Sequence, residues 1–269
     1  MPLFGMGTSG TMLPGRGPGL DSVPIGATDD RFLHHAARRD RRSPSARAGP
    51  VYRDGGHAAH PPLFLWAYDE APGLVRSAGP GDTDRAAYVG EVLGNFDKVL
   101  HIHHEGEDLL MYPQLAERAP ACALHVGLML EQHKQVTQRL EEIEPVRLRW
   151  MQTADAKVGQ ELAGLYEDLS SILKVHLRRE VTEVMPVVDR VMNQKEMEGV
   201  GQHGIEQFDK KFMVAYLGMV LATNPPKDRE ELFKEIPLPV RLAYRLVGRR
   251  MYRRQYSTLF PGRPIPATL

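Results

Sequence analysis

Two stretches of the chain repeat one arrangement of side chains that can bind metals or protons. The stretches HHEGEDLLMYP and HLRREVTEVMP both read His-x-x-x-Glu, with a proline six positions after the glutamate. Residues four apart lie one above the other on the same face of a helix. Each stretch therefore places an imidazole beside a carboxylate: His103 beside Glu107, and His176 beside Glu180.

Two such pairs on different helices predict a metal site. A charged carboxylate inside a helical bundle costs free energy unless a cation compensates it. Imidazole and carboxylate ligands on facing helices build the di-iron and di-manganese centres of bundle proteins. Between the two stretches, His133 in MLEQHKQV adds a third histidine. His104 and Asp108 are offset by about 100° from the paired residues, so we expect them to support the ligands or to face solvent.

Other metal sites fit these residues less well. A zinc protease carries His-Glu-x-x-His on a helix, and the stretch that begins with His104 and Glu105 lacks the second histidine. Structural zinc sites are rich in cysteine, whereas Cys122 is the one cysteine of the chain. Haem needs no paired carboxylates. These comparisons leave a paired-metal centre of the di-iron or di-manganese kind as the better fit, and the metal-free alternative is a network of salt bridges.

Apolar residues at helical spacing predict four helices that would position these groups. The first begins at the prolines of PPLFLWAYDEAPGLVRS, and the second begins with Thr83 as its N-cap. The third covers about 121–144 and ends near Pro145, and the fourth begins near Thr153. No segment reads as a strand. We therefore predict an all-α fold, with an antiparallel up-and-down four-helix bundle over residues 59–195.

Two regions of different character flank the predicted bundle. Residues 1–58 are rich in Gly, Pro, Arg and Ser, so we predict that they are largely disordered. Residues 196–269 are predicted to form a C-terminal helical extension. Within that extension, GVGQHG is expected to be a loop and PVRLAYRLVGRRMYRRQY a basic helix.

Arginines recur at every fourth position of the basic helix and share one of its faces. They are Arg241, Arg245, Arg249 and Arg253. Two interpretations stay open. The face is solvated above an apolar face packed on the bundle, or it contacts anionic lipid, nucleic acid or a partner protein.

The overall composition excludes several classes of protein. The chain has 34 Lys and Arg against 34 Asp and Glu, so no global charge attracts it to nucleic acid, and we expect no nucleic-acid partner. No apolar run approaches the roughly 20 residues that span a bilayer, and the first residues do not read as a signal peptide. A single cysteine suits a reducing compartment. We therefore expect a soluble cytoplasmic protein.

The two repeated stretches and the EQH around His133 resemble the hemerythrin-like proteins of the HHE cation-binding family. The resemblance covers about residues 60–195 and implies a four-helix bundle with a non-haem di-iron site. The ligands that it implies are His103, Glu107, His133, His176 and Glu180, with the two glutamates as candidate bridges. It further implies two iron ions bridged by carboxylate or oxo groups, and the binding or sensing of O2, NO, peroxide or iron.

The resemblance also implies a histidine on the first helix, and PPLFLWAYDEAPGLV contains none. In a hairpin centred near Pro80, the residue level with His103 lies about 23 positions before the turn, which points to His60 or His57. The stretch FLHHAARRD, which contains His34, instead resembles the family's usual first-helix sequence. We take His60 as the sixth metal ligand and keep His57 and His34 as alternatives.

The sequence carries no dedicated general acid or base and no electron-donor motif. We therefore expect a binding or sensing protein rather than an enzyme. Two alternatives stay open: a di-iron enzyme that reduces peroxide or NO, and a metal-free helical interaction module that uses the arginine-rich tail.

Overall fold

The computed structural model describes residues 60–207 and 210–269. The regular elements in these ranges are helical and no strand occurs there, so the predicted all-α class is confirmed. The α-helices are α1 (His60–Arg76), α2 (Thr83–Gly106), α3 (Tyr112–Arg118), α4 (Ala123–Thr153), α5 (Ala156–Arg179), α6 (Met185–Val191), α7 (Gln194–Gln207), α8 (Lys210–Thr223), α9 (Pro226–Glu235), α10 (Leu238–Ala243) and α11 (Arg249–Leu259). The predicted disordered region, with His34 and His57, lies outside the described residues.

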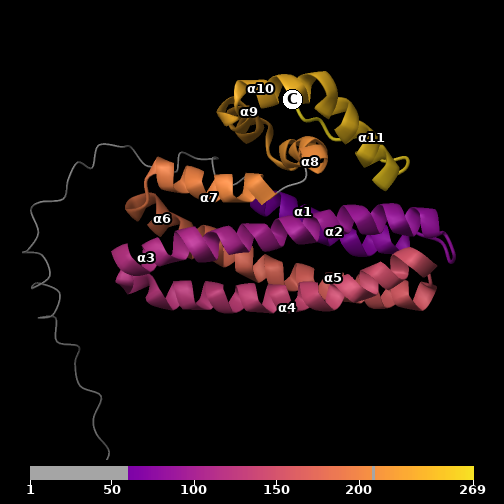
Figure 1. Cartoon of the computed structure of the whole chain (residues 1–269), viewed down its shortest axis with the longest axis horizontal. Helices are drawn as coiled ribbons and strands as arrows, with labels where there is room; N and C mark the ends of the chain where they lie inside the picture. Colours follow the sequence, from indigo (N-terminus) through magenta and orange to yellow (C-terminus); the bar gives the residue numbers. More distant parts are fainter. Residues whose placement is uncertain (1–59, 208–209) are drawn as a thin grey trace, which may run out of the picture. The chain divides into compact units, whose positions relative to one another are not determined.

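Four long helices, α1, α2, α4 and α5, pack side by side around one apolar core (Figure 1). Helix α1 contacts α2 and α5, and α4 contacts the same two helices from the other side. The largest side chains of this core include Phe64, Tyr68, Leu93, Leu100, Ile143, Trp150, Tyr166 and Leu173. Their spacing along each helix is the one that predicted the helices, because one face of each helix must be buried.

Aspartates begin two of these helices. Asp82 caps α2 by accepting a hydrogen bond of 3.1 Å from the backbone N–H of Arg85. Asp155 caps α5 by accepting from the backbone N–H of Lys157 at 2.8 Å and of Val158 at 3.0 Å. The predicted cap at Thr83 is therefore wrong by one residue, because the carboxylate before it makes the capping bond.

Helix α4 runs through Pro145, so the predicted helix end at that proline is wrong. A proline removes one backbone hydrogen bond and crowds the carbonyl four residues before it. Core packing on both sides of the proline keeps the helix continuous, because Ile143, Val146 and Trp150 are all buried. The helix ends instead at Ala154, which takes a left-handed conformation with φ of 45°.

Each repeated stretch contains a π-helical turn that begins at its glutamate. The turns are Glu107–Met111 and Glu180–Val184. In the first, the carbonyl of Glu107 accepts from the N–H of Tyr112, and in the second the carbonyl of Glu180 accepts from that of Met185. The proline that follows each turn cannot donate to the carbonyl four residues earlier and clashes with it in a regular helix. The repeated proline therefore accounts for the widened turn at both glutamates.

The C-terminal helices pack on the same core. Tyr216 of α8 and Tyr252 and Tyr256 of α11 belong to the core cluster of α1, α2, α4 and α5. Helix α7 contacts α2, and His203 lies in it, so the predicted loop at GVGQHG is wrong. The helix forms in spite of its glycines because α2 supports it: His203 Nε2 lies 3.2 Å from Glu105 Oε2.

Candidate metal centre

Two groups of metal-binding side chains converge inside the bundle. The first is the three-histidine group, His104, His133 and His176, and the second is the carboxylate group, His103, Glu107 and Glu180. In each group, one possible ligand atom of every member lies within 4.8 Å of the others. All of these residues are buried except His103, which is half-buried.

Three segments of the bundle supply these residues. The last turns of α2 and the π-helical turn after them carry His103, His104 and Glu107. The end of α5 and its own π-helical turn carry His176 and Glu180, and α4 carries His133. The two repeated stretches therefore meet across the bundle, as their spacing predicted.

The three imidazoles of the three-histidine group pack directly against one another. The rings of His104 and His133 are stacked, with centroids 3.9 Å apart and planes at 9°. The His176 ring lies edge-on to both, with centroid distances of 4.9 Å to His104 and 4.8 Å to His133. Three cationic imidazoles would repel one another at these distances, so the packing disfavours the state in which all three rings are protonated.

The surroundings favour the neutral form of two of these rings, His104 and His176. Burial, followed by the neighbouring His133 and His176, lowers the pKa of His104 well below its usual value. Burial and His133 lower the pKa of His176 to about 3. A neutral imidazole is the form that binds a metal, so both side chains are in the ligand form at neutral pH.

The carboxylates form short contacts with the histidines. Glu107 Oε1 lies 3.3 Å from His103 Nε2, and Glu107 Oε2 lies 3.5 Å from His133 Nε2. Glu180 Oε2 lies 3.9 Å from His176 Nε2. Burial and the charge of Glu180 raise the pKa of Glu107 well above its usual value, and burial also raises the pKa of Glu180. A cation between the two carboxylates would act against the effect of burial on both pKa values.

Unsatisfied polar atoms show that the residues fit a cation. Among the described residues, these buried atoms have no hydrogen-bond partner: both ring nitrogens of His104, Nε2 of His133 and His176, and Oε2 of Glu107 and Glu180. Buried polar atoms are nearly always hydrogen-bonded. Here they belong to two compact groups of imidazole and carboxylate donors, the ligand types that iron, manganese and zinc accept.

Two polar side chains lie within hydrogen-bond distance of the Nδ1 atoms of His133 and His176. Asp108 Oδ1 lies 2.7 Å from His133 Nδ1, and Gln132 Oε1 lies 3.4 Å from His176 Nδ1. A hydrogen bond at one ring nitrogen fixes the ring and leaves the other nitrogen for a metal. Asp108 therefore has the supporting position that the sequence predicted, while Gln132 was not foreseen.

The structure brings together five of the six predicted ligands and adds one. His60 begins α1, and its side chain lies outside the described part of the structure. His104 was expected to support the ligands or to face solvent, but its side chain is 3% exposed and belongs to the three-histidine group. The two consecutive histidines, His103 and His104, were the sequence signal for this position. Adjacent residues of a helix can face two neighbouring groups of ligands. His125 lies outside both groups, and its Nδ1 is 2.9 Å from Glu183 Oε2.

A second buried polar network lies further along the same bundle. Asp97 accepts hydrogen bonds from the hydroxyl of Tyr166 at 2.9 Å and from that of Tyr68 at 3.3 Å. Arg147 Nε lies 3.4 Å from Asp97 Oδ2, and Arg147 Nη1 donates to the carbonyl of Gly90 at 3.2 Å. This network contains its own cation and carries none of the metal-binding histidines.

Comparison with known proteins gives one match. The family model of the hemerythrin HHE cation binding domain matches residues 68–188, a range that contains both repeated stretches and His133. Neither a curated protein nor a solved structure matches the chain. The order of the motifs, the two converging ligand groups and the family match agree, and residues 68–188 belong to the hemerythrin HHE cation-binding domain family.

Proposed function

We propose that the protein binds two non-haem iron ions at the two ligand groups and uses them to bind or sense a small ligand: O2, NO or peroxide. The observation that carries the proposal is the pair of adjacent three-donor groups, with two buried carboxylates in one of them. Hemerythrin-type domains bind non-haem iron. Iron supplies reversible electron exchange with small ligands when it is bound.

The chain's own residues have distinct parts in this proposal. His104, His133 and His176 would hold one ion, and His103 with the two glutamates would hold the other. Asp108 would keep His133 oriented by its hydrogen bond of 2.7 Å. Because most of these side chains are at most 4% exposed, a small ligand fits the site better than a large substrate.

The cation is the part of the proposal that one experiment tests directly. Protein produced with iron in air should contain about two irons per chain, measured together with zinc and manganese by elemental analysis. His104→Ala should remove iron from the three-histidine group, and Glu180→Gln should weaken the carboxylate group. His125→Ala is the matched control, since His125 is a histidine of the same bundle outside both groups.

The outcomes of that experiment separate the alternatives. Iron retained in His125→Ala but lost in His104→Ala, in proteins with unchanged helical circular dichroism, supports the proposal. A folded wild-type protein that holds no iron would overturn it. Zinc or manganese bound at the same stoichiometry in preference to iron would overturn the choice of iron while keeping the site.

One observation favours a second candidate function, the reduction of peroxide or NO at the same cluster. The hydroxyl of Tyr112 is buried beside the carboxylate of Glu107. Its ring lies 5.5 Å from that of His133, centroid to centroid. A hydroxyl in that position could donate a proton. Multiple turnovers by the wild type, slowed in Tyr112→Phe at unchanged iron content, would favour the enzyme over a stoichiometric binder.

The remaining assignments belong to the same proposal. We propose that residues 59–195 form the metal domain and that residues 196–269 form an extension packed on it. The single cysteine favours a reducing compartment, and we propose the cytoplasm as the location.

A further inference from the structure

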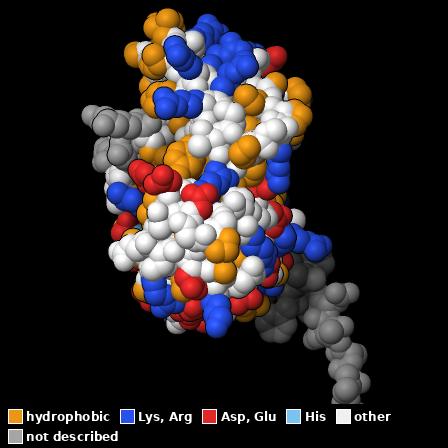
Figure 2. Space-filling view, turned by 90° about the vertical axis from the view of Figure 1, so that its right-hand side faces the viewer, with side chains coloured by type: hydrophobic (Ala, Val, Ile, Leu, Met, Phe, Trp, Pro, Cys, Tyr) orange, Lys and Arg blue, Asp and Glu red, His pale blue; other side chains and the backbone are white. Residues whose placement is uncertain are grey.

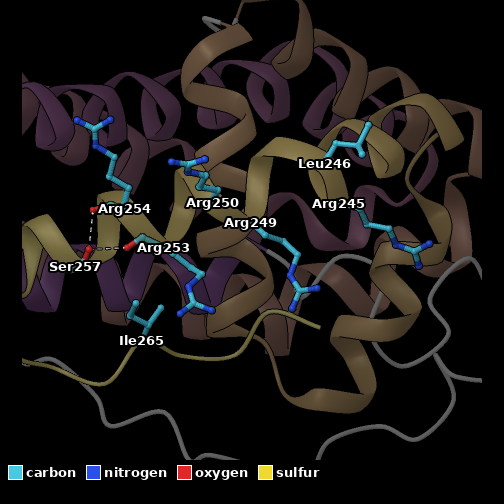
Figure 3. A pocket seen from close by; sticks show the side chains of 8 residues that line it. All are labelled: Arg245, Leu246, Arg249, Arg250, Arg253, Arg254, Ser257 and Ile265. Atoms are coloured by element: carbon cyan, nitrogen blue, oxygen red, sulfur yellow. Dashed lines mark hydrogen bonds between the residues drawn. The ribbon is translucent and has the colours of Figure 1, made fainter.

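A groove of about 480 Å³ on the C-terminal helices is lined mainly by arginines (Figure 3). Its lining residues are Arg245, Leu246, Arg249, Arg250, Arg253, Arg254, Ser257 and Ile265. They come from α11, from the π-helical turn Tyr244–Gly248 before it and from the segment after it. None of them belongs to the metal centre.

The positive charge of this groove is not compensated by nearby acids. Residues 238–269 contain seven arginines and no Asp or Glu, although the whole chain is balanced. Arg76 and Arg118, on other helices, do form salt bridges: Arg76 with Glu167 at 2.8 Å, and Arg118 with Glu196 at 2.7 Å. Across residues 60–207 and 210–269, no salt bridge involves any of the five groove arginines. The guanidinium carbon of Arg245 lies 5.3 Å from the centroid of the Phe233 ring.

Aliphatic side chains are exposed beside these arginines. Leu246, in the groove itself, is 80% exposed. Leu238 and Leu242 lie eight and four positions before it and are also exposed, as is the adjacent Val247. Figure 2 shows Lys and Arg side chains gathered beside hydrophobic ones at the top of the view. The packed apolar face that the sequence suggested is present as buried tyrosines, and it leaves these outward leucines without a role.

We propose that α10, the π-helical turn after it and α11 form a docking surface for an anionic membrane. The arginines would contact lipid phosphates and carboxylates, and the exposed leucines would enter the boundary between headgroups and acyl chains. No described helix is both long and apolar enough to cross a bilayer, so the contact is with the surface of the membrane.

The kind of exposed apolar side chain favours lipid over nucleic acid. Proteins that hold single-stranded nucleic acid combine positive charge with aromatic side chains on which bases stack. The aromatic residues of this segment, Tyr244, Tyr252 and Tyr256, are buried. The apolar side chains exposed beside the arginines are leucines, valines and Met251. Aliphatic side chains partition into a membrane boundary but offer no stacking surface.

Sedimentation of the full-length protein with vesicles tests this surface. The probes are vesicles of phosphatidylcholine alone and with about 30% phosphatidylserine, at low and at high salt. The wild type should bind the anionic vesicles, and salt should weaken the binding. The variant Arg249→Gln/Arg250→Gln/Arg253→Gln should bind about 100-fold more weakly. Leu242→Ser/Leu246→Ser should lose the part of the binding that survives high salt.

A matched control removes the same charge elsewhere. Lys98→Gln/Arg190→Gln/Lys195→Gln changes three exposed cations outside the groove and should bind as the wild type does. Equal loss in the control, or no preference for anionic vesicles, would overturn the proposal. Tighter binding to a duplex oligonucleotide than to vesicles at the same salt would overturn it in favour of nucleic acid. Iron content, measured in every variant, keeps this result independent of the metal centre.

Discussion

The bundle holds two buried polar networks about two helical turns apart along α2, and they are compensated in different ways. Asp97 faces Arg147 and accepts hydrogen bonds from two tyrosines. Glu107 and Glu180 face histidines, and within the described residues no Lys or Arg forms a salt bridge with either. The first network contains a cationic side chain of the protein itself, whereas the described residues supply no Lys or Arg to the second.

The presence of Arg147 beside Asp97, and the lack of such a partner for Glu107 and Glu180, distinguishes a structural network from a candidate binding site. Burial and a raised pKa occur in both, since burial also raises the pKa of Asp97, to about 6. Only the metal centre combines buried acids with neutral histidines and unsatisfied donor atoms. A missing internal counter-charge is therefore a better guide to the ligand site than a perturbed carboxyl group alone.

The largest expected loss of stability comes from a substitution in the network of Asp97 and Arg147. Arg147→Met leaves the buried Asp97 without its cation and should lower the free energy of unfolding by about 3–5 kcal/mol. Urea unfolding at pH 8 measures the loss, which should be the same with and without iron. Asp97→Asn/Arg147→Met should recover part of it. A loss of unfolding free energy that appears only in iron-loaded protein would mean that the Asp97 network and the candidate metal centre are energetically coupled.

Removal of iron should lower the stability of the folded protein by a comparable amount. This effect should depend on the histidines and glutamates of the candidate metal centre. A ligand present at about 1,000 times its dissociation constant stabilises the folded state by about 4 kcal/mol. A chelator should therefore lower the midpoint of thermal unfolding, followed by circular dichroism. His104→Ala should show little further change on chelation, while Arg147→Met should show the full change. An unchanged wild-type midpoint would contradict the assignment of iron as the missing cation.

The smallest expected effect is a dependence of the free energy of unfolding on pH, caused by the carboxyl group of Asp97. Burial raises its pKa from 3.8 to about 6, against the opposing influence of Arg147 and the two tyrosines. Between those values the folded protein holds a proton that the unfolded chain releases, so stability falls as pH rises from about 4 to 6. The loss should be about 3 kcal/mol at most and absent in Asp97→Asn. Urea titrations of both proteins measure it, with Asp168→Asn as an exposed control.

Much of this arrangement was predictable because helical spacing is local. The His-x-x-x-Glu spacing placed each pair on one helix face, and the repeat indicated that the two pairs would meet. His104 was missed because an offset of about 100° was taken to point away from the ligands, although it points toward α4 and α5. Asp97 was missed because its partners, Tyr68, Arg147 and Tyr166, come from three other helices.

The π-helical turns have a consequence for how such a site can arise. A π turn holds one residue more than an α turn, so Glu107 and Glu180 each begin a segment that is one residue longer than a regular helix needs. Deleting one residue from Glu107–Met111 and replacing Pro113 would together allow a regular helix there, with the register of α3 unchanged. Each stretch thus differs from a regular bundle helix by the same two local features, one extra residue in a turn and a proline after it.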